Sequence, residues 1–270
     1  MVKAELERFA RDQAFVVHIS LRNSLCRVLG KYKLYVDPFD TSIAPSLMMD
    51  GIWESWITMA LTGIVRKGMN VVNVGANVGY YAMLLADMVG SGGKVLAFEP
   101  QKRLAELIRM SAHANGFYGH RVDVRAFAVG DKNRIGLKMR LNSTRNGYAF
   151  ICDELELKHV VQDGEEVLVD QVSLDAECVS ADEKVDLVVM DCEGSEERVW
   201  DGMQHLLDRN PQMQLVLEFT PMFFSAPRLF AKKLMGRGHS MFEICEDGTL
   251  AEIAIDELCQ RYQTNIALLK

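Results

Sequence analysis

The spacing of hydrophobic residues along the chain changes near residue 67. Upstream, residues 3–29 place apolar side chains every three or four positions, which predicts one or two amphipathic helices. Residues 32–36 alternate like a short strand, and residues 51–66 return to helical spacing. The pattern therefore predicts an N-terminal helical extension and lead-in over residues 1–66.

Over residues 67–270, apolar runs and segments of helical spacing alternate. The runs at 69–74, 94–98, 185–190 and 215–219 are nearly continuous, as in strands buried on both faces of a parallel sheet. Helices are expected at 77–89, 101–115, 195–208 and 227–235. This alternation predicts an α/β fold in which a doubly wound, mostly parallel sheet is covered by helices on both faces.

One segment interrupts the alternation. Residues 135–141 and 166–172 alternate between apolar and polar side chains, which predicts an inserted β-hairpin. The loop between them, 142–164, is polar and long, and such loops in compact domains are often functional. We therefore expect this loop to lie over a binding site. Two further short strands, near 240–245 and 265–269, are expected to close the sheet.

The composition excludes several classes of protein. A chain of 270 residues with 49% apolar and 25% charged residues is long and apolar enough to bury a full core. A net charge of −7 and the lack of a basic run argue against nucleic-acid binding. The six cysteines lie singly, which favours free thiols over a disulfide scaffold or a zinc site. With no signal peptide or transmembrane segment recognisable, we expect a cytoplasmic location.

The first buried run leads into a turn that contains glycine, where residues 74–81 read VGANVGYY. Glycine lets the backbone turn sharply and lets a ligand approach it closely. In a doubly wound sheet such a turn lies at the carboxyl edge of the strands, where ligands bind. Asn77 stands where a dinucleotide fingerprint has its second glycine. The turn therefore suits a ligand that offers an amine and a carboxylate to backbone groups.

An acidic residue, Glu99, directly follows the next buried run. Its carboxylate can accept hydrogen bonds from both hydroxyls of a ribose. An acid at the end of a strand can equally be a helix cap or a solvated group. Combined with the glycine turn, however, Glu99 indicates a ribose-binding residue.

Together these segments resemble S-adenosylmethionine-dependent methyltransferases, and in detail the FkbM family. Residues 74–81 and the AFEP of 97–100 are similar to the family's first two motifs, and the AVG of 128–130 to another. The DCEGSE of 191–196 is similar to its D-x-E-G-x-E motif. The resemblance extends over about residues 33–245.

The resemblance implies a Rossmann-like class I methyltransferase fold that binds S-adenosylmethionine. It places cofactor binding at Asn73, Gly75, Asn77, Gly79, Tyr80, Glu99, Pro100, Val129 and Asp191. It also implies an O-methyltransferase that acts on a hydroxyl of a sugar or glycosylated metabolite. Two positions depart from the family pattern: Asn73 replaces the usual Asp, and Met190 replaces a frequent Lys.

Methyl transfer to an alcohol requires a group that takes up the hydroxyl proton. The candidate catalytic residues are Asp191 and Glu193, at the carboxyl edge of the sheet, and His159 in the long loop. A close pair of acids could also hold Mg²⁺, with Glu218 as a further ligand. No feature of the sequence demands a metal.

Two other functions fit parts of the pattern. A nicotinamide-dependent oxidoreductase would share the ribose-binding acid, and a non-catalytic domain would bind the cofactor or a partner without turnover. The expected partners are a small-molecule or glycan acceptor and a second copy of the chain, joined through the N-terminal helices.

Overall fold

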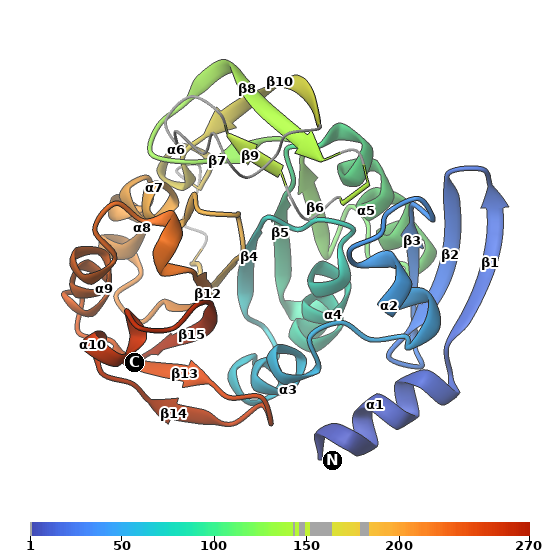
Figure 1. Cartoon of the computed structure of the whole chain (residues 1–270), viewed down its shortest axis with the longest axis horizontal. Helices are drawn as coiled ribbons and strands as arrows, with labels where there is room; N and C mark the ends of the chain where they lie inside the picture. Colours follow the sequence, from blue (N-terminus) through green and yellow to red (C-terminus); the bar gives the residue numbers. More distant parts are fainter. Residues whose placement is uncertain (1, 143, 146–148, 152–163, 179–183) are drawn as a thin grey trace.

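The computed structural model describes residues 2–142, 144–145, 149–151, 164–178 and 184–270 (Figure 1). Its centre is an eight-stranded sheet with the order β14-β13-β15-β12-β11-β4-β5-β6. The strands are β4 (Asn70–Val74), β5 (Lys94–Phe98), β6 (Val122–Arg125), β11 (Leu187–Met190), β12 (Gln214–Phe219), β13 (Ser240–Ile244), β14 (Leu250–Glu252) and β15 (Thr264–Leu269). From β6 to β12 all neighbours are parallel, whereas β13, β14 and β15 pair antiparallel. The predicted mostly parallel sheet is confirmed.

Helices cover both faces of this sheet. Alternate residues of a strand point to opposite faces, and here both sets are apolar, so each face is buried under helices. Val71 and Val189 pack with α3 (Ser55–Ile64), α4 (Tyr80–Val89) and α5 (Lys102–Ala114). Val72 and Val188 point the other way. They pack with α6 (Leu174–Glu177), α7 (Glu196–Asp201), α8 (Gln204–Arg209), α9 (Pro227–Met235) and α10 (Ile255–Leu258). The single helix predicted over 195–208 is two helices, α7 and α8.

The N-terminal extension differs from its prediction. Within residues 3–29 only α1 (Lys3–Asp12) is helical, and β1 (Phe15–Ser20), β2 (Asn23–Val28) and β3 (Tyr32–Val36) form an antiparallel sheet. The helical prediction for residues 3–29 is therefore wrong from residue 13 on, whereas the strand predicted at 32–36 is confirmed. The β-branched residues of β1 favour an extended backbone, and the buried residues of β2 recur at every second position.

Hydrogen bonds attach this extension to the main sheet's helices. On β3, the Tyr35 amide donates to Ser111 Oγ and the Lys33 amide to Asn115 Oδ1, both at 2.9 Å, so α5 covers the open edge of β3. The helix α2 (Ala44–Met49) then leads to α3. The extension shares one hydrophobic core with α3, α4 and α5. Self-association through it stays a prediction.

The inserted hairpin is confirmed as part of a second sheet with the order β7-β10-β8-β9. Its strands are β7 (Ala128–Val129), β8 (Arg134–Asn142), β9 (Ala149–Ile151) and β10 (Gly164–Val172). In Figure 1 this sheet lies beside the upper ends of β4 and β5. Among the described residues, no helix is long and apolar enough to cross a membrane.

Candidate functional site

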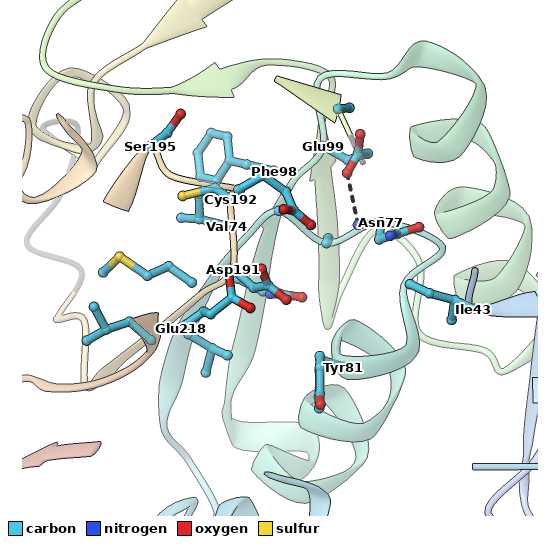
Figure 2. A pocket seen from close by; sticks show the side chains of 18 of the residues that line it. Ile43, Val74, Asn77, Tyr81, Phe98, Glu99, Asp191, Cys192, Ser195 and Glu218 are labelled. Carbon is cyan, nitrogen blue, oxygen red and sulfur yellow. Dashed lines mark hydrogen bonds between the residues drawn. The ribbon is translucent and has the colours of Figure 1, made fainter. Parts of the chain in front are cut away.

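A cavity of about 500 Å³ opens at the carboxyl ends of β4, β5, β11 and β12 (Figure 2). This is the edge at which doubly wound sheets bind ligands. The cavity is lined by the predicted residues Asn73, Gly75, Asn77, Tyr80, Glu99, Pro100, Val129, Asp191 and Glu193. Residues of the inserted sheet, including Met139 and Ile151, line it as well. The structure therefore brings together residues that lie far apart in the sequence.

Of the predicted residues that the structure describes, Gly79 is not among those that line the cavity. Gly79 is in the left-handed conformation at the start of α4, where an added Cβ would lie 3.1 Å from Ile108. Glycine at this position thus allows α4 and α5 to pack closely, and cofactor binding by Gly79 stays a prediction. His159 lies outside the described residues, so its role as a base stays a prediction.

Gly75 has the backbone conformation that the turn after β4 requires. Its φ of +73° is in the region that favours glycine. An added Cβ would lie only 1.8 Å from the carbonyl oxygen of Asp191. The turn therefore approaches the segment after β11 more closely than any side chain allows.

Glu99 joins this turn to the end of β5. Its two carboxylate oxygens accept hydrogen bonds from the Asn77 and Gln101 amides, each at 2.9 Å (Figure 2). The side chain is buried, and this burial raises the pKa of Glu99 to about 7. Since a carboxylate oxygen has two acceptor sites, each can still accept a hydroxyl from the cavity.

Two amide oxygens that line the cavity have no hydrogen-bond partner. Asn73 Oδ1 and Asn77 Oδ1 are both buried and unpaired among the described residues. An unpaired buried acceptor costs free energy, so native proteins normally satisfy such atoms. Both oxygens therefore indicate a ligand with hydrogen-bond donors, such as an ammonium group.

Carboxyl groups dominate the end of the cavity near β11 and β12. Burial and the neighbouring acids Asp191 and Glu196 raise the pKa of Glu193 to about 9. Burial raises the pKa of Asp191 to about 6. At neutral pH the proton therefore resides on Glu193, while Asp191 is mainly ionised. Glu193 also has a left-handed backbone, with φ of 52°, which is unusual away from glycine.

A further acid, Glu54, was not among the predicted site residues. It precedes α3 and lines the cavity with its hydrogen-bond partner Tyr81, whose hydroxyl donates to Glu54 Oε2 at 2.6 Å. Burial first, and Asp191 second, raise the pKa of Glu54 to about 7. The resemblance to the FkbM family extends over residue 54, which was the available signal, but spacing alone could not bring residue 54 to the end of β11.

A family model decides what kind of site this is. The model of the methyltransferase FkbM domain matches residues 73–239, more than half of the chain. This chain belongs to the FkbM methyltransferase domain family. The match starts at Asn73 and includes the glycine turn, Glu99 and the acidic segment after β11. Because it belongs to this family, the chain is an S-adenosylmethionine-dependent methyltransferase and not a nicotinamide-dependent oxidoreductase. The family does not determine its substrate.

A solved structure agrees with this family in fold. Methyltransferase FkbM from Methylobacillus flagellatus KT is 12% identical with a TM-score of 0.50, over 78% of this chain and 47% of that chain. This chain thus spans about half the length of that protein.

Two other matches have lower TM-scores. A SAM dependent methyltransferase from Aquifex aeolicus is 13% identical with a TM-score of 0.40, over 76% of this chain and 84% of that chain. The O-methyltransferase from Bacillus cereus in complex with SAH is 13% identical with a TM-score of 0.45, over 80% of both chains. No curated protein matches the sequence.

The cavity of this FkbM-family chain fits the cofactor that the family implies. Glu99 can take the ribose hydroxyls, as its free acceptor sites allow. The unpaired oxygens of Asn73 and Asn77 suit the ammonium group of the methionine part. At Gly75 the turn has no Cβ, so a ligand can lie directly against the backbone. The Asn73 side chain carries no charge, unlike the Asp usual in the family, but the acids Glu54 and Asp191 line the same cavity.

Proposed function

We propose that this chain is an O-methyltransferase that methylates a hydroxyl of a sugar or glycosylated metabolite. The observation that carries the proposal is the arrangement of the cavity, which has the buried acid Glu99 at one end and a cluster of acids at the other. S-adenosylmethionine, when bound, supplies an electrophilic methyl group that is already activated. The protein then has to align the acceptor oxygen and take up its proton.

The acceptor is proposed to enter beside the acidic end. There the cavity is lined by aromatic and amide side chains, including Trp53, Phe223, Tyr262 and Gln263. Aromatic faces and amide groups are suited to the apolar faces and hydroxyls of a sugar. The net charge of −7 supports a neutral or cationic acceptor over a nucleic acid.

Asp191 and Glu193 are the two candidates for the proton acceptor. Both line the cavity; Asp191 directly follows β11, and Glu193 comes two residues later. A base with a pKa slightly below neutral is mainly ionised and still binds a proton well, which favours Asp191 in the free protein. The comparison of Asp191→Asn with Glu193→Gln decides between them.

The test has two steps. Calorimetric titration with S-adenosylhomocysteine measures cofactor binding, and no binding at high micromolar concentration would reject the proposal. Mass spectrometry then searches for methylated products across sugars, glycans, phenols and nucleosides. Cofactor binding without any product would instead favour the non-catalytic domain.

A further inference from the structure

Three acids from separate segments come together at the end of the cavity. Asp191 follows β11, Glu218 lies near the end of β12, and Glu196 begins α7. Each offers a carboxylate oxygen, and these oxygens all lie within 4.8 Å of one another. The sheet produces this arrangement, because β11 and β12 are parallel neighbours with Met190 opposite Leu217. Figure 2 shows Asp191 and Glu218 side by side.

No positive side chain compensates these three acids within the described part of the chain. The Cys192 amide donates to Glu196 at 2.8 Å, the Cys192 thiol also donates to Glu196, and the Gln263 side chain donates to Glu218. Glu196 and Glu218 are buried. Burial and mutual repulsion raise the pKa of Glu218 to about 10. Such a cluster is unfavourable unless protons or a cation neutralise it.

A second observation points to a ligand at the same place. Thr220 is 4% exposed, lines the cavity, and its Oγ1 has no hydrogen-bond partner among the described residues. It lies two residues after Glu218, so an extended chain directs both side chains to the same face. A buried hydroxyl without a partner is costly, whereas hydroxyl oxygens of Ser and Thr are known Mg²⁺ ligands.

We propose that Asp191, Glu196 and Glu218, with Thr220 beside them, bind a hard divalent cation such as Ca²⁺, Mn²⁺ or Mg²⁺. All of these donors are oxygens, which such cations prefer over the nitrogen and sulfur ligands of zinc. Calcium–oxygen bonds of about 2.3–2.6 Å place opposite ligands up to roughly 5 Å apart, so the spacing accepts Ca²⁺ directly. The shorter bonds of Mg²⁺, about 2.1 Å, require the acids to move slightly closer.

The role of this cation rests on the proposed function, whereas the site itself rests on the geometry. A cation at the acceptor end would polarise the hydroxyl and favour loss of its proton. Asp191 would then be a cation ligand. The positive charge would lower the pKa of Glu193, which is outside the cluster, so that Glu193 would be ionised and take up the proton.

The test titrates the full chain with Ca²⁺, Mn²⁺ and Mg²⁺ separately, after EDTA treatment and without cofactor or acceptor. Calorimetry is expected to show one saturable site, with Mn²⁺ also detected by electron paramagnetic resonance. Glu218→Gln and Glu196→Gln are each expected to weaken binding at least tenfold, because an amide offers one neutral oxygen. The control Glu252→Gln removes an exposed acid on β14 and should leave binding unchanged.

Absence of saturable binding at low millimolar cation would overturn the site, as would unchanged binding in both cluster variants. Circular dichroism checks that the variants fold, which is expected because Gln has the shape of a protonated Glu. Titration with S-adenosylhomocysteine in EDTA, on the same preparation, tests the proposed function separately. If the protein binds S-adenosylhomocysteine but no cation, only the cation site is overturned. If it binds a cation but no S-adenosylhomocysteine, only the methyltransferase proposal is overturned.

Discussion

The carboxylate of Glu99 accepts a hydrogen bond from the backbone amide of Asn77 at 2.9 Å. This contact joins the end of β5 to the turn after β4, so Glu99 and the glycine turn form one unit. The second oxygen of Glu99 accepts from Gln101 at the start of α5. The orientation of the carboxylate is therefore set before any ligand binds, which reduces the entropic cost of binding.

Replacing Glu99 by Gln is expected to weaken binding of S-adenosylhomocysteine at least tenfold, or about 1.4 kcal/mol. The amide lacks the charge that strengthens hydrogen bonds from hydroxyls, and its NH₂ group opposes one of the two backbone amides. Calorimetry at pH 8, where Glu99 is mainly ionised, measures the change. Equal affinity in Glu99→Gln and the wild type would remove Glu99 from the ribose-binding role.

Gly75→Ala is expected to destabilise the protein by about 2–4 kcal/mol and to abolish detectable cofactor binding. The new Cβ would lie 1.8 Å from the Asp191 carbonyl oxygen and force the turn away from β11. Urea denaturation and calorimetry measure the two effects.

Gly116→Ala is the matched control for this substitution. Gly116 has a similar φ of +69°, but no atom lies within 4 Å of the position that an added Cβ would take. It therefore carries the backbone strain without the steric clash, and a cost of about 1 kcal/mol is expected. Equal losses in both variants would show that backbone strain alone explains the effect at Gly75.

Tyr81→Phe removes the hydrogen bond of 2.6 Å that the hydroxyl donates to Glu54. Glu54 is mostly enclosed, so loss of its donor is expected to cost about 1–3 kcal/mol. Urea denaturation measures this cost, and the change in the KM for S-adenosylmethionine reports on the cavity. Tyr262→Phe, at a cavity residue that is 79% exposed, should leave stability unchanged. Equal stability of Tyr81→Phe and the wild type would contradict a structural role for this contact.

The protein is expected to be more stable at pH 6 than at pH 9. Burial raises the pKa of Glu54 and Glu99 to about 7 and that of Glu218 to about 10, above the usual value of 4.5. The folded chain thus binds more protons than the unfolded chain, so stability falls as pH rises through these folded values. The midpoint of thermal unfolding should drop by about 3 °C or more between the two pH values. A midpoint that is equal or higher at pH 9 would contradict this prediction.

Sequence alone determined the central architecture, because buried parallel strands and amphipathic helices each have a characteristic hydrophobic period. It also located Gly75 and Glu99, since both directly follow buried strands. The sequence-based prediction of a helix was wrong at residues 15–28. These residues form strands because β2 pairs with β3. Local periodicity cannot include the energy of pairing with a distant segment.

Only the tertiary structure decided which acids act together. Glu54 and Glu218 lie 164 positions apart (218 − 54), yet both line one cavity with Asp191. Glu196, the first residue of α7, belongs to the acidic cluster with Asp191 and Glu218. The proton affinities of these groups also depend on the fold, because burial and neighbouring charges shift a pKa and both arise only when the segments pack together.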